Sequence, residues 1–154
     1  MLRAEQAIEL LGLKPLTVEG GFFFELYRSP RTLPDGRTLG TSIYYLLRRG
    51  DRSCWHCVKS DEIWYYHAGA PAIQTLIDDA GRETRVRIGS DLANGERPQS
   101  LIPGGVWQTA WIDPDSEYDW GLFGAAVFPG FEYADFQGAT DAEMAAIIAE
   151  LRQS

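Results

Sequence analysis

The sequence predicts an all-β fold, an antiparallel barrel of two packed sheets with one short helix near each end of the chain. Many short segments combine β-favouring residues with strand-like spacing, turn residues separate them, and helical periodicity is confined to the two ends. The absence of alternating strand and helix patterns favours a sandwich, barrel or jelly roll. The expected strands are 21–28, 41–48, 52–58, 62–67, 72–77, 85–88, 99–102, 106–111, 120–128 and 132–136.

The first helix is expected over residues 3–12. Ala4, Ile8 and Leu11 recur at helical spacing, and Gly12 stands where a left-handed residue would close the helix. Pro15 then prevents its continuation.

The second helix is expected over residues 141–152. Thr140 and Glu143 have the spacing of a capping box, in which each side chain bonds the other residue's backbone amide. An apolar stripe follows that should dock on the barrel: Met144, Ile147, Ile148 and Leu151.

A single domain is expected over residues 1–154, with a barrel core over about 19–136. The length of 154 residues suits one domain. Turn signals such as Asn94-Gly95 and Pro103-Gly104-Gly105 punctuate the chain, but no repeat or linker divides it.

The net charge of the chain limits the classes of partner that it is expected to bind. A formal net charge of −8 with dispersed basic residues argues against nucleic acid and anionic membranes. No apolar run approaches the ~20 residues of a membrane helix. Glu5 and Glu9 interrupt the apolar start of the chain, which is unlike a signal peptide, so a cytoplasmic location is expected.

Two cysteines form a C-x-x-C pattern at Cys54 and Cys57. On a strand, residues three apart lie about 10 Å apart and point to opposite faces. This exceeds the Cα separation that a disulfide permits. Two packed thiols are therefore favoured over a redox pair.

The most informative segment runs from Gly50 to Gly69. It resembles the first motif of the cupins, in which a Gly is followed by His-x-His, a Glu and a second Gly. His56 and Glu62 occupy the matching positions, while Val58 stands where the second His would be.

The second cupin motif, centred on Pro-x-Gly-x-x-His, resembles the segment from Pro103 to Gln108. Gln108 replaces its His, Arg97 its leading Gly and Ile112 its trailing Asn. Further segments resemble a family of small, uncharacterised cupins: Glu19-Gly20-Gly21-Phe22-Phe23, Lys59 to Trp64, Pro129-Gly130-Phe131 and Asp135-Phe136. The resemblance implies a jelly-roll barrel of the RmlC type, usually dimeric, and related in shape to the sugar-nucleotide epimerases.

A ligand pocket follows if His56 and Glu62 face inward, as the first motif implies. Because side chains alternate across a strand, further residues should share the inner wall. These are Cys54, Val58, Trp64, Tyr66, Gln108, Val106 and Ala110. The result is an apolar cavity with a few convergent polar groups, the usual form of a small-molecule site.

A metal is not expected. A typical metal cupin supplies three His and one Glu, whereas this chain offers His56 and Glu62, with Gln108 as a weak third ligand. Structural and catalytic metal sites normally need three protein ligands or more. If a metal is bound nonetheless, these three residues are its candidate ligands.

Two functions remain open. In the first, the protein is an isomerase- or epimerase-like enzyme on a polar or sugar-like metabolite, with His56 as general base, Glu62 as its partner and Tyr66 or Tyr45 as proton donor. In the second, it is a non-catalytic module for a carbohydrate-like ligand, in which His56, Glu62 and Gln108 only form hydrogen bonds and Trp64 and Tyr66 stack on the ligand. The expected ligand-binding residues are Trp64, Gln108, Cys54 and Tyr45. His67 falls outside the inward set and is expected at the surface. In either case a homodimer is expected, because jelly-roll barrels expose strand edges.

Overall fold

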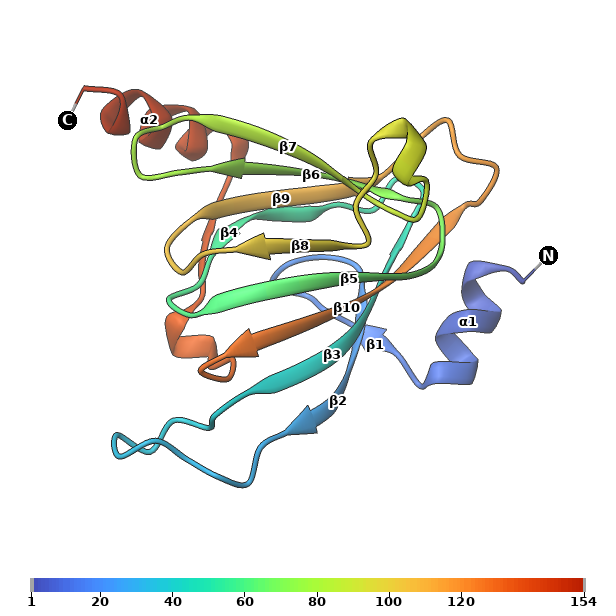
Figure 1. Ribbon diagram of the computed structural model, residues 1–154, viewed down its shortest axis with the longest axis horizontal. Helices are drawn as coiled ribbons and strands as arrows, with labels where there is room; N and C mark the ends of the chain where they lie inside the picture. The colour runs from blue at the N-terminus through green and yellow to red at the C-terminus, as the bar shows by residue number, and fades with distance from the viewer. Residues whose placement is uncertain (1, 154) are drawn as a thin grey trace.

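Two antiparallel sheets face each other in the computed structural model, which describes residues 2–153 (Figure 1). The helices lie at opposite ends of the molecule, α1 near the N-terminus and α2 near the C-terminus. The elements are α1 (Ala4–Leu11), β1 (Lys14–Pro15), β2 (Phe22–Arg28), β3 (Thr41–Arg48), β4 (Ser53–Cys57), β5 (Asp61–Gly69), β6 (Ala72–Ile77), β7 (Glu83–Ile88), η1 (Leu92–Asn94), β8 (Gln99–Ile102), β9 (Trp107–Ile112), β10 (Trp120–Phe128), η2 (Tyr133–Asp135), β11 (Gln137–Ala139) and α2 (Asp141–Leu151).

The strand order is that of a jelly roll. One sheet has six strands in the order β1-β2-β3-β10-β5-β8, and the other has five in the order β11-β4-β9-β6-β7. Strands far apart in sequence pair with each other, as β3 does with β10 and β4 with β9. The expected all-β barrel is confirmed.

Both helices form where the sequence predicts them. Gly12 adopts the left-handed conformation, with φ of 63°, and closes α1. The Thr140 hydroxyl accepts from the Glu143 amide while the Glu143 carboxylate accepts from the Thr140 amide, which is the predicted capping box. Met144, the buried residue of α2, packs with Ile77 and Trp107.

The expected strand over 132–136 is wrong. Residues 133–135 instead form the 3₁₀ turn η2, and the short strand β11 that follows the segment pairs with β4. The apolar residues Phe131, Tyr133 and Phe136 suggested a strand, but two of them serve as walls of a cavity described below. The two-residue strand β1 was not expected either, since Pro15 reads as a breaker.

A bulge in β4 changes which of its residues face inward. Ser53 pairs with Ala110 and His56 with Gln108, so three steps along β4 match two along β9. Ser53 and His56 are therefore both buried, at 0% and 2% exposure, whereas Cys54 is half-exposed. The expectation that Cys54 shares the inner wall with His56 is wrong, because strict alternation ends at a bulge.

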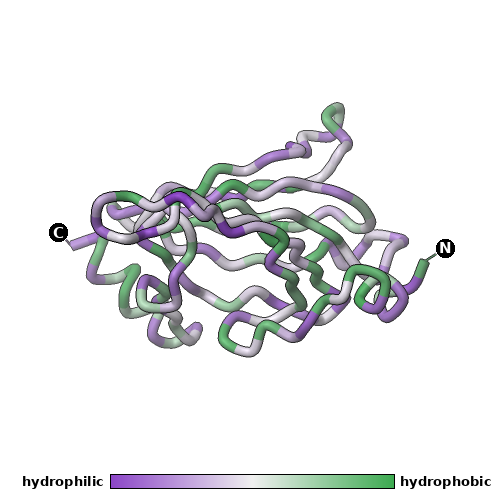
Figure 2. The backbone as a smooth tube through the Cα atoms, turned by 90° about the horizontal axis from the view of Figure 1, so that it is seen from below, coloured by the Kyte–Doolittle hydropathy of each residue, from purple (hydrophilic) through white to green (hydrophobic). Residues whose placement is uncertain are grey.

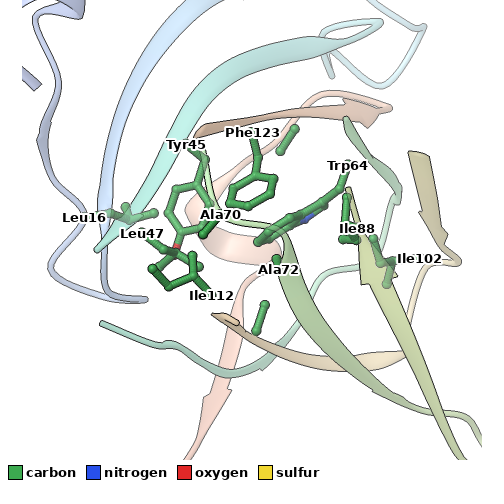
Figure 3. Close-up of a cluster of buried hydrophobic side chains, with 12 residues drawn as sticks. Leu16, Tyr45, Leu47, Trp64, Ala70, Ala72, Ile88, Ile102, Ile112 and Phe123 are labelled. Atoms are coloured by element: carbon green, nitrogen blue, oxygen red, sulfur yellow. The ribbon is translucent and has the colours of Figure 1, made fainter. Parts of the chain in front are cut away.

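Aromatic rings fill the middle of the barrel. Tyr45, Trp64 and Phe123 lie side by side between the sheets, each at most 1% exposed (Figure 3). Trp64 meets the edge of Tyr45 at 5.3 Å between ring centroids and lies 5.5 Å from Phe123. Ile88, Ile102 and Ile112 extend this cluster. Because the rings occupy the centre, open space is left toward the end of the barrel.

Hydrophobic and hydrophilic residues alternate in short runs along the strands, as Figure 2 shows from below. This is the pattern of sheets with one buried face. Within residues 2–153, no helix is long and apolar enough to cross a membrane.

Candidate functional site

A cavity of about 80 Å³ opens between the sheets, beyond the aromatic core. Strands of both sheets, the β1–β2 loop and the η2 segment supply its walls. The lining residues are Leu16, Val18, Glu19, Phe23, Glu25, Arg28, Thr41, Ile43, His56, Val58, Glu62, Ala125, Val127, Phe131 and Tyr133. Most are apolar, so the few polar groups decide what the cavity can bind.

Glu62 is the most firmly held of these polar groups. Its Oε1 accepts from the Trp64 indole Nε1 at 3.1 Å, and its Oε2 accepts from the Gln108 Nε2 at 2.6 Å. The residue is only 8% exposed, and burial raises the pKa of its carboxyl, while His56 and the two donors act in the opposite direction. The carboxylate is thus fixed in position but costly to ionise.

A chain of hydrogen bonds extends from Glu62 into the core. The Gln108 Oε1 accepts from Gln74 Nε2 at 3.3 Å, and the Gln74 Oε1 accepts from the Ser100 hydroxyl at 2.6 Å. All of these residues are buried. An indole N–H can only donate, so Oε1 of Glu62 accepts from Trp64. In the chain from Ser100 through Gln74 and Gln108, each donor likewise points toward the Glu62 carboxylate.

His56 presents one ring nitrogen to the cavity. Its Nδ1 lies 2.7 Å from the backbone carbonyl of Cys54, which can only accept, so Nδ1 carries a proton. In the neutral ring Nε2 is then unprotonated, and it lies 3.8 Å from Oε1 of Glu19. The imidazole also stacks on Phe136. Its tautomer and orientation are therefore both fixed.

Glu19 is the site residue that sequence reasoning missed. Its Oε1 accepts from the buried Ser53 hydroxyl at 2.7 Å. The backbone beside it needs glycine, because a Cβ at Gly20 would lie 2.2 Å from the carbonyl oxygen of Arg52. The Gly pair after Glu19 lets the chain pass tightly against β4 and brings Glu19 to His56.

Charged side chains surround the mouth of the cavity. The Arg28 guanidinium makes two bonds to Glu25, one to Glu132 and one to the Phe131 carbonyl. These bonds, chiefly that to Glu25, raise its pKa. Arg28 therefore ties β2 to the segment that precedes η2.

A second cluster anchors η2 itself. The Asp135 carboxylate pairs with Arg37, and its other oxygen lies 3.5 Å from Lys59 Nζ. Together with Arg28, these pairs hold the residues 131–136 across the cavity.

The remaining predicted site residues lie outside the cavity wall. Tyr45 donates to the Gly20 carbonyl at 2.8 Å and supports the β1–β2 loop. Tyr66 donates to the Gly69 carbonyl at 2.7 Å, away from the lining residues. Cys54 Sγ contacts the Val18 carbonyl, and Cys57 also carries a free thiol. His67 is exposed, as expected for a histidine outside the inward set.

The residues present do not fit a cupin metal centre. Val58 lines the cavity at the place of a second His and offers no donor atom. Both ends of the Gln108 amide are engaged, with Glu62 and with Gln74. Across the described part of the chain, no three His, Cys, Asp or Glu residues are arranged to hold a metal ion.

Comparison with known proteins identifies relatives over most of the chain. Residues 5–139 match the family model described as Cupin superfamily (DUF985). The yeast protein YML079W of Saccharomyces cerevisiae, described as uncharacterized, is 30% identical over an alignment of 132 residues, and the match covers 76% of this chain. The match spans 66% of the yeast protein, just under two thirds of its length.

Solved structures share the fold closely. The crystal structure of protein SO0799 from Shewanella oneidensis has a TM-score of 0.89 at 37% identity, covering 99% of this chain and 94% of that one. A hypothetical protein from Leishmania major has a TM-score of 0.86 at 31% identity, covering 98% and 95%. Oxalate decarboxylase from Bacillus subtilis, at 22% identity and a TM-score of 0.60, covers 86% of this chain and 32% of its own and shares the fold alone.

Proposed function

The chain belongs to the cupin superfamily, in the family DUF985, and on that premise we propose that it binds a small polar molecule in the cavity and catalyses a metal-independent proton transfer on it. The reaction class is isomerisation or epimerisation. Fold membership does not select this chemistry, because one fold hosts many functions. The argument therefore rests on the cavity.

The arrangement of His56 is the observation that carries the proposal. Its Nδ1–H is committed to the Cys54 carbonyl, which leaves Nε2 as a proton acceptor directed at the cavity. An imidazole whose ordinary pKa is about 6.5 is suited to remove a proton near neutral pH. The nearby Glu62 and Glu19 carboxylates stabilise the imidazolium that results.

The proposed step begins with transfer of a proton from a carbon next to a carbonyl to Nε2 of His56. The C–H electron pair becomes the double bond of an enolate, and the carbonyl oxygen takes the negative charge. A proton delivered to the same carbon from the opposite face, by water, gives an epimer. In a hydroxyaldehyde or hydroxyketone, return of the proton from His56 to the former carbonyl carbon, with loss of the proton of the neighbouring hydroxyl as that carbon becomes the new carbonyl, gives an isomer. Tyr133 is the tyrosine that lines the cavity and serves as the proton donor to the oxygen, in place of Tyr45 and Tyr66.

Hydrogen exchange tests this proposal without knowledge of the natural substrate. A panel of small hydroxyaldehydes and hydroxyketones is incubated with the protein in D₂O, and loss of the α-proton signal is followed by NMR. We expect exchange above background for at least one compound, reduced about 10²-fold or more by His56→Gln. His67→Gln is the matched control, since the chain has only two histidines and this one is exposed.

A binding module is the second candidate. Both oxygens of Glu62 already accept hydrogen bonds, which suits a rigid ligand contact as well as an acid–base role. Ligand binding in the cavity without exchange for any compound of the panel would favour this second function and contradict the first.

A further inference from the structure

We propose that the cavity selects a small organic cation, a protonated amine on a short apolar body, with its ammonium group between Glu19, His56 and Glu62. The inference rests on the proposed assignment of the cavity as the binding site and not on the proposed proton transfer. An ammonium N–H bonded to Nε2 of His56 would occupy the lone pair that takes the proton, so the cation would compete with the substrate of that reaction. It names the class of ligand.

The donors beside Glu19 and Glu62 are already engaged, because the Ser53 hydroxyl donates to Glu19 and the Trp64 indole and Gln108 amide donate to Glu62. The groups left to meet a ligand beside His56 are acceptors. Carboxylates accept hydrogen bonds, and the neutral His56 ring presents its unprotonated Nε2. Elsewhere on the wall, the Thr41 hydroxyl accepts from the Phe131 amide and keeps its own O–H as a donor. A ligand group beside His56 must therefore donate.

The two carboxylates have no basic partner. Among the described residues, the ion pairs of Arg and Lys go to other acids, and the only charged or titratable side chain paired with Glu19 by an ion-pair contact is His56. Arg28, the one guanidinium on the cavity wall, is bonded to Glu25, Glu132 and the Phe131 carbonyl. A buried carboxylate without a counter-charge is costly, and a bound cation would remove that cost.

His56 supplies an independent observation, an acceptor on a buried side chain that is free for a ligand. The residue is 2% exposed, yet its Nε2 has no partner closer than Glu19 at 3.8 Å, which is beyond hydrogen-bond distance. An ammonium group has three N–H donors in a compact head. Glu19, His56 and Glu62 supply one acceptor to each of them.

The rest of the wall favours an organic cation over a metal ion. Its apolar residues include Leu16, Val18, Phe23, Ile43, Val58 and Val127. They suit a short hydrocarbon body, whereas a divalent ion would need water or further oxygen ligands on that side. An amine with an apolar tail matches both halves of the cavity.

Three isosteres test the charge requirement: butylammonium, 1-butanol and butyrate. Each is titrated into the protein, and NMR follows the Trp64 indole N–H, which bonds directly to Glu62. We expect butylammonium to bind about tenfold or more tightly than 1-butanol, and butyrate to give no saturable shift. Equal or tighter binding of 1-butanol would overturn the proposal.

Glu19→Gln tests the position of the ammonium. The amide oxygen can still accept from Ser53, so the local structure is kept while the charge is lost. Butylammonium affinity should fall about tenfold, with 1-butanol affinity unchanged. Glu9→Gln, on the exposed face of α1, is the control and should change neither. Should Glu19→Gln not fold, the isostere comparison on the unmodified protein still decides.

The remaining outcomes separate this inference from the proposed function. If butylammonium shifts no signal of Trp64 or His56, the cation inference fails, and His56-dependent exchange of a compound of the panel would leave the proton-transfer proposal standing. If butylammonium binds but no compound undergoes exchange, the cation inference stands and the proton-transfer chemistry fails. If Zn²⁺ or Mn²⁺ alone binds more tightly than butylammonium and displaces it, the site is a metal site and the inference is wrong.

Discussion

The ring of Phe136 lies stacked on the imidazole of His56, with ring centroids 5.3 Å apart and an interplanar angle of 15°. Phe136 directly follows η2, whose Asp135 is clamped by Arg37 and Lys59. The orientation of the proposed base thus depends on a segment distant in sequence and held by surface ion pairs. Substitutions in that segment should therefore alter how firmly the His56 ring is held in its orientation.

Phe136→Leu tests this dependence. The substitution keeps an apolar side chain but removes the stacked ring, and aromatic pairs contribute about 0.5–1.5 kcal/mol beyond their burial. We expect a loss of about 1 kcal/mol in the free energy of unfolding, measured with urea, together with broader His56 ring signals in NMR. Unchanged His56 signals would show that the Cys54 carbonyl alone orients the ring.

The barrel could be predicted from the sequence because its strands are short, apolar and separated by turn residues. The helix ends were equally clear, since Gly12 and the Thr140–Glu143 box act locally. The inward positions of His56 and Glu62 depended instead on the family resemblance. Local signals therefore determine the elements, and the motif places the centre of the site.

The rest of the site depends on features that the sequence does not display. The bulge between Ser53 and His56 turns Cys54 away, and periodicity alone cannot reveal an inserted residue. Glu19 reaches His56 through a tight passage of the chain at Gly20, and Phe136 through the fold of η2. These contacts are long-range, so no local pattern predicts them.

Stability should depend on pH through Glu62. Burial raises its pKa above the ordinary value of 4.5, so the folded protein holds this proton more tightly than the unfolded chain. The stabilising contribution is complete below the ordinary pKa and is lost as pH rises through the raised one. We expect the unfolding free energy of Glu62→Gln, relative to the unmodified protein, to increase across that interval.

The difference in unfolding free energy between Glu62→Gln and the unmodified protein isolates the contribution of Glu62 from those of other acids. Asp78, Asp91, Asp113 and Glu143 have lowered pKa values, and their contributions have the opposite sign. They are common to both proteins and cancel in the difference. Urea titrations at a series of pH values give the curve, and a difference that is independent of pH would mean that Glu62 ionises as freely as in the unfolded chain.

The purified protein should carry no stoichiometric transition metal. Val58 offers no donor, and the Gln108 amide is bonded at both ends. His56 and Glu62 alone provide fewer ligands than the three that such sites normally need. Elemental analysis is the measurement. About one Zn, Mn or Fe per chain, lost in His56→Ala, would contradict this prediction.

A homodimer remains a prediction, and the edge of the six-stranded sheet favours it. The short strand β1 pairs only with Phe22 and Phe23, so the rest of β2 exposes backbone groups to a further strand. Leu26 and Tyr27 on this edge are 57% and 54% exposed. Light scattering at micromolar concentration should show a dimer, weakened by Leu26→Glu and not by Leu10→Glu on α1. A monomer of the unmodified protein would refute it.

All the hydrogen bonds in the chain from Glu62 through Gln108 and Gln74 to Ser100 should be able to reverse direction together. In Glu62→Gln, the new amide nitrogen would face the Gln108 nitrogen, donor against donor, unless Gln108 turns over. Gln74 must then turn as well, and the Ser100 hydroxyl changes from donor to acceptor, which a hydroxyl can do. Every bond is remade, so we expect this variant to lose no more than about 1 kcal/mol of stability.

Gln74→Glu places a carboxylate between Gln108 and Ser100 and so distinguishes the two possible directions of the hydrogen bonds. Alone, it sets a carboxylate at each end of Gln108, whose amide cannot donate to both with its single NH₂ group, so a loss of about 2–3 kcal/mol is expected. Combined with Glu62→Gln, the reversed chain is satisfied again: Ser100 and Gln108 both donate to the new acid. Urea unfolding of the four proteins gives the coupling energy, which should favour the double variant by about 1 kcal/mol or more. Additive losses would mean that the two amides keep their orientation whatever residue stands at position 62, and that the chain does not reverse.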